Sequence, residues 1–381
     1  MLIGFQQSMN KIKIGLSISL TGNYSIQGVE SFEGIKLWLQ ETNSRGGIFV
    51  RELGATFPIE LIYYDDESSV EKCSSNVEKL IKEDNVYILL GPYSSSLALA
   101  ACEVAEQYNK TLWNHGGSTD EILERPFTCV INAITPASNY SCGIIDAIKN
   151  ADPDAMKIAT FSAQNSGFST RVANGAKFYA QSLGFDIREY KFISGTKDFS
   201  AHLEDLASYE PDLILGMGRA EDDLALAKQI VKQGVYSKAA GFIVASIKLF
   251  KDKFGRKADG ILSASQWERG LQIVPDIGPS SEGFFSKFMS VYGKEPDYVA
   301  AQGYNIGIII EKCIQEAGTL DDLTLRRVAK SADFKTFYGT FKTDTNGNQT
   351  GHEMVVVQWQ EGGKVIVYPK SVAQTKILYP R

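Results

Sequence analysis

Short apolar runs alternate with amphipathic segments along most of this chain. The apolar runs have the length of strands, and the segments between them place apolar residues three and four positions apart, as on one face of a helix. This alternation predicts a parallel α/β architecture, because a helix must carry the chain back before the next parallel strand begins. The first series of predicted elements is Lys13–Ser19, Gly28–Thr42, Pro58–Tyr64, Ser69–Glu83, Val86–Leu90, Leu97–Tyr108 and Thr111–Asn114.

A second series with the same rhythm begins near Met156. Its predicted elements are Lys157–Ser162, Arg171–Leu183, Ile187–Phe192, Ser200–Ser208, Leu213–Gly216, Asp222–Gln233, Gly241–Val244, Gly260–Ser263, Ser281–Tyr292 and Val299–Ala317. Two similar series predict two similar doubly wound parallel-sheet lobes. From Phe337 onward, alternating apolar residues and the turns Asn346-Gly347 and Gly362-Gly363 predict a hairpin instead.

The segment Val86–Glu106 carries the clearest chemical signal. An apolar run ends in Gly-Pro, three serines follow, and a helical pattern starts at once, so hydroxyls and backbone N–H groups collect at the positive end of a helix. A second polar turn, Gly116 to Thr119, follows the strand Thr111–Asn114. Plain helix capping explains either turn alone, but their recurrence at strand ends favours a site for a small anionic group.

Composition narrows the classes of partner. The 381 residues suit two domains, and 44% hydrophobic and 22% charged residues are typical of a globular protein. A net charge of −6 without Lys/Arg clusters argues against a nucleic-acid partner. No apolar run is long enough to span a membrane, and the opening MLIGFQQSMNKIKIGLS lacks the charged and apolar regions of an export signal.

Cofactor and metal chemistry find little support. LILGMGRAEDDLALAKQ resembles a dinucleotide fingerprint, but Glu221 replaces the third glycine and would repel a pyrophosphate. Asp65-Asp66-Glu67 follows a strand and could bind a cation, although acids before a helix are more often dipole partners. Five cysteines without a CxxC pair argue against zinc, and a Cys73–Cys102 bridge stays possible. We therefore expect neither a metal nor a cofactor.

Catalysis also lacks an anchor. The three histidines are far apart in the sequence and form no metal-ligand pair, and Ser95 has no G-x-S-x-G context and no evident base. A base such as His115 could reach Ser95 only through the tertiary fold. We expect a protein that is not an enzyme.

In the order and spacing of its motifs, the chain resembles the type I periplasmic solute-binding proteins, specifically the leucine/isoleucine/valine-binding family of ABC-transporter receptors. The motifs are IKIGLSISLTGNYSIQGVESFEGIKLWLQETNSRGGI, GPYSSS, the glycine-rich turn after Trp113, EPDYVAAQGYNIG and YGTFKTDTNGNQ. The resemblance implies two lobes, each discontinuous in sequence, with a solute between them. It assigns residues 10–133 plus 265–340 to lobe 1 and residues 134–264 plus 341–381 to lobe 2, with three crossings near 132–135, 263–266 and 340–342.

The resemblance also implies which residues bind the solute. They are Tyr24, Gln27, Tyr93, Ser95, Ser96, Gly116, Gly117, Ser118, Phe168, Arg219 and Trp267. Ser95 or Ser96 falls where the family holds the solute carboxylate, together with Ser118 and the amides of the two glycines. Gln27 falls where relatives place an aromatic ring, which Tyr24 on the same turn could supply.

The second lobe departs from the family pattern. Ala245-Ser246 stands where amino-acid-binding relatives carry an acid for the solute ammonium, and Arg219 stands where they often carry Tyr. A standard α-amino acid is disfavoured unless Glu221, Asp222 or Glu268 takes over that role, because an unpaired buried ammonium is costly. Arg219 could instead hold a second acidic group. The aromatic candidates suit an aromatic or amphipathic acid.

We therefore expect a receptor in the periplasm or at the cell surface. It would be a monomer that binds a small carboxylate-bearing solute with hinge closure and delivers it to a membrane ABC permease. The alternative is a cytosolic amide- or amino-acid-sensing regulator with the same fold, and a weaker one is an α/β enzyme with Ser95 as its nucleophile.

Overall fold

The computed structural model describes residues 10–380 and divides into two compact units. Residues 1–9 and Arg381 lie outside the described residues. The expectation about an export signal therefore concerns a segment of which the structure describes only the part from residue 10 onward. The first unit contains the chain up to Gly117, then Glu121–Ile134 and Ile273–His352. The second unit contains Ser118–Asp120, Thr135–Gln272 and the chain from Glu353 onward.

Besides Ser118–Asp120 and Ile134, two longer segments lie in the opposite unit from the one that the sequence predicts. Residues 265–272 belong to the second unit, since Ser265 still pairs with Val355 in that unit's sheet. Residues 341–352 belong to the first unit, since Thr343 bridges Gln349 close to a first-unit hairpin. The pattern from Phe337 was interpreted as one hairpin, and the boundary was therefore placed too early.

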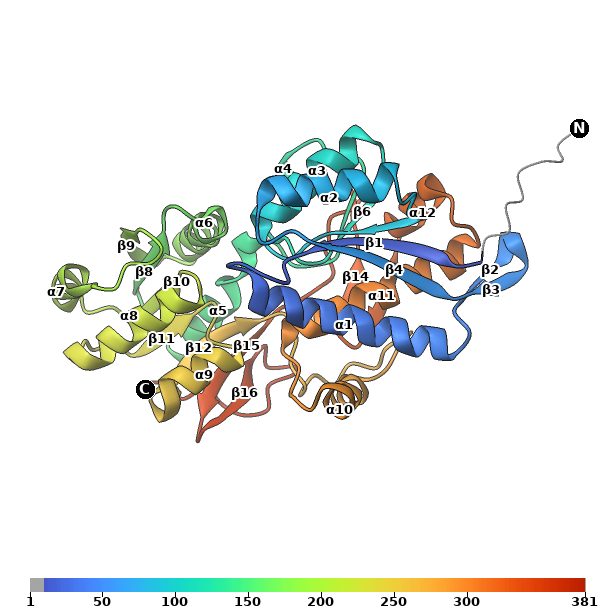
Figure 1. The fold of residues 1–381 in the computed structure, drawn as a ribbon. Helices are drawn as coiled ribbons and strands as arrows, with labels where there is room; N and C mark the ends of the chain where they lie inside the picture. Colours follow the sequence, from blue (N-terminus) through green and yellow to red (C-terminus); the bar gives the residue numbers. More distant parts are fainter. Residues whose placement is uncertain (1–9, 381) are drawn as a thin grey trace, which may run out of the picture. The chain divides into compact units, whose positions relative to one another are not determined.

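The first unit is a doubly wound α/β layer. Its described elements are β1 (Ile12–Ile18), α1 (Ser25–Ser44), β2 (Ile48–Val50), η1 (Arg51–Leu53), β3 (Ala55–Phe57), β4 (Ile59–Asp65), α2 (Val70–Lys82), β5 (Ile88–Leu90), α3 (Ser95–Gln107), β6 (Leu112–Asn114), α4 (Glu121–Glu124), β7 (Val130–Asn132), α10 (Ser281–Tyr292), α11 (Tyr298–Ala317), α12 (Asp322–Ala329), β13 (Asp333–Thr336) and β14 (Gly339–Lys342). The parallel sheet has the order β4-β1-β5-β6-β7. Helices α2 and α3 cover one face and α1 and α11 the other (Figure 1).

Close packing of α1 against α11 depends on glycines. A Cβ at Gly34 would lie 2.0 Å from the Ala300 carbonyl oxygen, and one at Gly303 would lie 2.2 Å from that of Ser31. The two backbones therefore nearly touch, and no larger side chain fits between them. This contact fixes α1 against its sheet and so positions the turn that precedes it.

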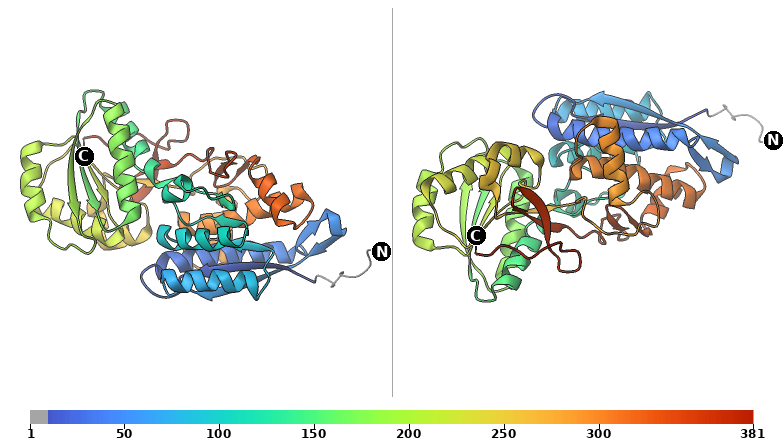
Figure 2. Two further views of the ribbon diagram at one scale, coloured as in Figure 1. Left: turned by 90° about the horizontal axis from the view of Figure 1, so that it is seen from above. Right: turned by 90° about the horizontal axis from the view of Figure 1, so that it is seen from below.

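The second unit has a mixed sheet. Its described elements are η2 (Ala137–Asn139), α5 (Cys142–Ala151), β8 (Lys157–Ala163), α6 (Gly167–Ser182), β9 (Asp186–Phe192), α7 (Ser200–Tyr209), β10 (Leu213–Met217), α8 (Ala220–Gln233), β11 (Ala239–Phe242), α9 (Lys248–Phe254), η3 (Gly255–Ala258), β12 (Ile261–Ser265), β15 (Val355–Gln360) and β16 (Gly363–Tyr368). The strand order is β16-β15-β12-β11-β10-β8-β9. Strands β8 to β12 are parallel, and β15 and β16 run antiparallel at one edge, where the right-hand view of Figure 2 shows β16 in dark red.

The C-terminal pattern corresponds to two hairpins. The pair β13–β14 belongs to the first unit, and β15–β16 joins the sheet of the second unit through the predicted turn at Gly362-Gly363. The sequence had predicted a parallel sheet for the second lobe. In the structure this sheet also contains the antiparallel strands β15 and β16. None of the described helices has the length and apolar character needed to cross a bilayer.

Candidate functional site

Three of the predicted binding turns lie at one edge of the first unit's sheet. Strands β1, β5 and β6 are parallel neighbours, so the turns that follow them end at the same edge. These turns and the helix starts beside them carry Tyr24, Gln27, Tyr93, Ser95, Ser96, Gly116 and Gly117. The structure thus brings together all the candidates that lie in the first unit.

The turns after β5 and β6 are joined to each other. Tyr93 and Gly116 form a parallel bridge, and the Ser94 N–H donates to the Gly116 carbonyl at 3.2 Å. A Cβ at Gly116 would lie 2.5 Å from the Pro92 carbonyl oxygen, so only glycine allows this approach. The glycine that was predicted as an amide donor therefore also holds the two turns in contact.

Ser94 caps α3, and this leaves Ser95 available. The Ser94 side chain accepts a hydrogen bond from the Leu97 N–H, and Ser94 has φ 92° and ψ 147°, a conformation that is costly outside glycine. Ser96 is exposed and its hydroxyl lies 3.4 Å from that of Ser94. Within the described residues, the half-buried Ser95 hydroxyl at the start of the helix makes no hydrogen bond. The sequence analysis considered helix capping without naming a residue, and the structure gives that role to Ser94; ligand binding by Ser95 or Ser96 stays a prediction.

The amide of Gly117 is not open to a ligand, which corrects one expectation. It donates to Asn114 Oδ1 at 2.9 Å, and Asn114 Nδ2 donates back to the Gly117 carbonyl at 2.7 Å. A Cβ at Gly117 would lie 2.1 Å from the Ala98 Cβ. Gly117 therefore acts through close packing of its turn on α3 instead of through its N–H group.

The acidic pair Asp65-Asp66 at the end of β4 holds the turn after β1. Asp66 accepts hydrogen bonds from the Ser19 hydroxyl at 2.5 Å, and Asp65 accepts them from the Leu20 N–H at 3.0 Å and the Thr21 hydroxyl at 2.8 Å. Burial alone would raise the pKa of Asp65, but these and other hydrogen bonds lower it overall. The sequence analysis interpreted Asp65-Asp66-Glu67 as a cation site or as partners of a helix dipole. It did not predict that Asp65 and Asp66 bind the turn after β1 through hydrogen bonds. In the described part of the chain, no group of three or more His, Cys, Asp or Glu residues could hold a metal ion.

His115, the base considered for a Ser95 nucleophile, contacts Ser31. His115 is 1% exposed, and its Nε2 lies 2.8 Å from the Ser31 hydroxyl. Burial lowers the pKa of His115 to about 4. Within the described residues, Ser95 therefore makes no hydrogen bond to a histidine.

The aromatic candidates in the second unit are packed. Phe168, at the start of α6, meets Tyr140 edge to face at 5.3 Å, and Trp267, just after β12, is 2% exposed. Ser118 is also buried, and its carbonyl accepts the Ala137 N–H at 2.7 Å. Of the second-unit candidates, Arg219 is the exposed one.

Two neighbouring acids at the start of α8 have different surroundings. Asp222, an acid that the sequence offered for a solute ammonium, accepts the Ser194 hydroxyl and the Gly195 N–H, both at 2.7 Å, and the Arg219 N–H at 3.1 Å. Asp223 is 1% exposed and accepts the Gly218 N–H at 2.7 Å. Burial raises the pKa of Asp223 to about 8, so this carboxyl is mainly neutral at pH 7. Asp222 ties two loops together, and sequence reasoning missed Asp223.

The other two acids are paired with lysines. Glu268 Oε1 lies 2.8 Å from Lys364 Nζ, with both side chains largely buried. The exposed Glu221 lies 3.4 Å from Lys253 Nζ. None of the three acids that the sequence offered is thus without a partner in the structure.

The cysteines form no bridge. All five are free thiols, and the Cys73 Sγ lies 3.5 Å from the Leu97 carbonyl oxygen. Burial raises the pKa of the Cys73 thiol to about 12. The possible Cys73–Cys102 disulfide is therefore not present.

Comparison with known proteins identifies the family. A family model described as "Periplasmic binding protein" matches residues 11–364. The chain belongs to the periplasmic binding protein family. Leu/Ile/Val-binding protein homolog 7 of Brucella suis biovar 1 (strain 1330) is 24% identical over 406 residues, which cover 100% of this chain and 97% of the relative.

Solved periplasmic binding proteins share the fold. LivJ of Streptococcus pneumoniae, in complex with isoleucine, matches with a TM-score of 0.78 at 19% identity over 94% of this chain and 100% of its own. A solute-binding protein of an ABC transporter from R. palustris, in complex with benzoate, matches with a TM-score of 0.77 at 19% identity. The match covers 96% of this chain and 99% of that protein's chain. The predicted resemblance and the two-lobed α/β fold class are confirmed, and the members of this family are binding proteins.

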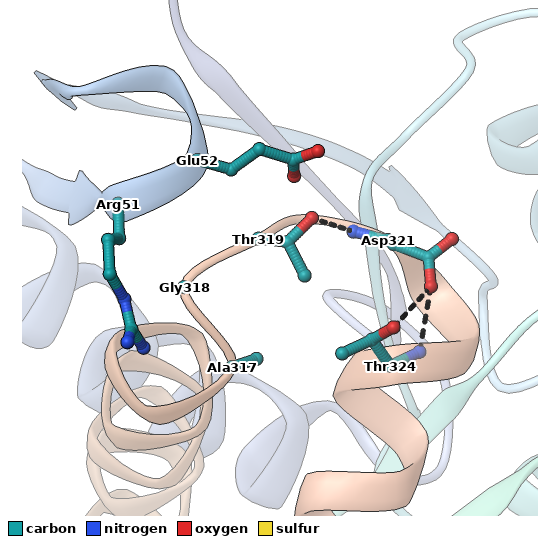
Figure 3. A pocket seen from close by; sticks show the side chains of 7 residues that line it. All are labelled: Arg51, Glu52, Ala317, Gly318, Thr319, Asp321 and Thr324. Atoms are coloured by element: carbon teal, nitrogen blue, oxygen red, sulfur yellow. Dashed lines mark hydrogen bonds between the residues drawn. The ribbon is translucent and has the colours of Figure 1, made fainter.

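A hollow elsewhere on the first unit of this binding protein is not a comparable site. It has a volume of about 630 Å³ and lies between the β2–β3 hairpin and the end of α11 (Figure 3). Two of its charged side chains are bonded locally, since Asp321 accepts from the Thr324 N–H and hydroxyl and Arg51 donates to the Glu316 carbonyl at 2.8 Å. Because α11 ends here, we place this hollow near the amino ends of the strands, away from the candidate turns.

Proposed function

We propose that this protein is the extracytoplasmic solute receptor of an ABC transporter, and that it binds a small carboxylate-bearing solute. The observation that carries the proposal is the Ser95 hydroxyl, which lies at the positive end of α3 without a hydrogen-bond partner in the described chain. A hydroxyl in that position is suited to donate to a carboxylate. Membership of the periplasmic binding protein family supports the role.

The names of the relatives support a carboxylate as the recognised group. The Brucella relative is called a Leu/Ile/Val-binding protein homolog, and the two solved structures hold isoleucine and benzoate. These molecules differ in size and in the presence of an ammonium group, but each carries a carboxylate. We infer that the first unit holds this shared group through Ser95 and the turns beside it, with Tyr24, Gln27, Tyr93, Ser96 and Gly116 as further wall residues and Ser118, Phe168, Arg219 and Trp267 contributing from the second unit.

The role implies a location and a partner. We propose that the protein acts in the periplasm or at the cell surface, as a monomer, and that solute binding favours a closed form that docks on a membrane permease. A regulator of the same fold would bind its solute equally well but would not stimulate a permease. Transport assays in reconstituted vesicles, with and without the protein, separate the two roles.

The binding site is tested with a thermal-shift screen against amino acids, amides, aromatic acids and dicarboxylates, followed by calorimetry on the best carboxylate. A hydrogen bond to a charged partner contributes about 1.5–3 kcal/mol, so Ser95→Ala should weaken binding roughly 10- to 150-fold. Ser75→Ala, at an exposed serine on α2, is the matched control and should bind normally. Unchanged affinity in Ser95→Ala would show that another residue binds the carboxylate. A loss of affinity in Ser96→Ala alone would assign that role to Ser96.

A further inference from the structure

A lysine and a glutamate form a largely buried pair in the second unit. Lys364 Nζ, from β16, lies 2.8 Å from Glu268 Oε1, and the two side chains are 22% and 11% exposed. The same ammonium also donates to the Ser246 carbonyl at 2.8 Å. Lys364 therefore joins the segment after β12 to the segment after β11.

The Lys364 ammonium and the Glu268 carboxylate meet beside the segments that follow β11 and β12, although the Lys364 backbone lies near the amino end of β12, opposite Trp359. Strands β11 and β12 are parallel neighbours, so Ser246 and Glu268 follow their carboxyl ends side by side. Strand β10 is the next neighbour, and its end carries the turn with Arg219. Ligands of doubly wound sheets bind outside the carboxyl ends of the strands, so this edge is where the second unit meets a solute.

The charges at this edge do not favour an ammonium. Asp222 is used by the backbone and hydroxyl donors of two loops, and Asp223 is buried against the Gly218 N–H. Lys364 neutralises Glu268, and Arg219 adds a positive charge. Asp222 and Glu268 are thus already engaged by groups of the protein itself, and Asp223 is buried.

We propose that Lys364 is a specificity-determining residue: by pairing with Glu268, it makes the solute site select carboxylates that carry no ammonium group. The inference rests on the proposed function and names its substrate class. A solute ammonium would have to compete with Lys364 for Glu268, and both charges would then lie at one carboxylate with like-charge repulsion between them. A solute with only an anionic or polar end avoids this competition.

The first test compares solutes that differ only in the ammonium group. Phenylalanine is paired with 3-phenylpropanoate and leucine with 4-methylpentanoate, and their dissociation constants are measured by calorimetry on the whole protein. We expect the member without the ammonium to bind at least tenfold tighter in each pair that binds. Tighter binding of the amino acids would overturn this inference and leave the proposed receptor function intact. If neither these acids nor any acid of the screen binds, the proposed function itself fails.

The second test removes the competing lysine. Lys364→Gln should release Glu268 and reduce the preference against the amino acid at least tenfold, and Glu268→Gln added to it should abolish that gain. Lys251→Gln is the matched control, because Lys251 lies over the same Trp359 ring, at 5.1 Å, but pairs with Asp259. An unchanged preference in Lys364→Gln would contradict the inference. If that variant does not fold, Lys364→Arg should keep the wild-type preference, and the solute pairs on the wild type still decide the question.

An exposed acid beside this edge supplies a further control. Glu353, just before β15, is exposed, and β15 begins opposite the end of β12. If Glu353 held a solute ammonium, the wild type would prefer the amino acids and Glu353→Gln would remove that preference. We expect Glu353→Gln to change neither dissociation constant.

Discussion

Replacing Asp223 by asparagine should change how the stability of the second unit depends on pH. Burial raises the pKa of this carboxyl to about 8 in the folded protein, from an ordinary value of 3.8. Its Oδ1 accepts the Gly218 N–H at 2.7 Å, and its Oδ2 is buried without a hydrogen-bond partner. The negative charge of Asp222 acts in the same direction as burial. The folded state therefore holds a proton that the unfolded chain has already released.

The magnitude follows from linkage. Between about pH 4 and pH 8 the folded state binds one more proton at this site, so stability falls as the pH rises through that window. From pH 5 to pH 8 the loss amounts to about 4 kcal/mol at most, at 1.36 kcal/mol for each pH unit. The substituted asparagine cannot ionise, but it places an amide group where Oδ2 has no partner, which costs about 1–3 kcal/mol. Asp223→Asn should therefore be less stable than the wild type at pH 5 and more stable at pH 9.

The assay is hydrogen–deuterium exchange with mass spectrometry from pH 5 to pH 9, corrected for the intrinsic exchange rate. Peptides from β10 and β11 report on the second unit, and peptides from β1 and β5 serve as an internal control. Asp198→Asn is the matched variant, since Asp198 is an exposed acid just before α7 whose pKa is lowered by its hydrogen bonds to Ser200. A stability difference between Asp223→Asn and the wild type that stays constant across this range would refute the reasoning.

Two further predictions concern the first unit. Because a Cβ at Gly117 would lie 2.1 Å from the Ala98 Cβ, Gly117→Ala should lower the stability by about 1–3 kcal/mol in urea unfolding. Gly167→Ala, where a Cβ would meet nothing within 4 Å, should change it by less than about 0.5 kcal/mol, and equal effects would contradict the packing argument. Burial lowers the pKa of His115 to about 4, so the unfolded chain binds more protons between pH 4 and 6.5 and stability should fall as the pH drops through that window. The loss is about 3 kcal/mol at most, and a His115→Gln variant that keeps the wild-type slope in urea unfolding would exclude this histidine as its source.

The order of helices and strands was largely predictable because it is encoded locally. The predicted helix Leu97–Tyr108 and the predicted strand Pro58–Tyr64 correspond to α3 (Ser95–Gln107) and β4 (Ile59–Asp65), because patterns within a few residues indicate both. The short elements were missed for the same reason, since three-residue strands such as β2 and β3 show no period. The unit boundary near Glu353 was misplaced because two adjacent hairpins give one continuous alternating pattern.

The candidate site was predictable only where a single turn carries it. Ser95 follows from its own helix start, but the capture of the Gly117 amide by Asn114 depends on how that turn folds back. The hold of Asp66 on Ser19 joins two strand ends that are distant in the sequence, and no local pattern marks it.

The contact between Lys364 and Glu268 was the least predictable from the sequence. A lysine on an edge strand and a glutamate after a parallel strand each resemble ordinary surface residues in the sequence. Their contact exists because β16 pairs with β15 beside β12, so that the Lys364 side chain, which starts near the amino end of β12, reaches the Glu268 carboxylate that follows its carboxyl end. The sequence considered Glu268 as a partner for a solute ammonium, and the fold supplies a protein ammonium in its place. Under the proposed function, residues that select the solute can therefore belong to the C-terminal strands, outside the motifs that carry the resemblance in the sequence.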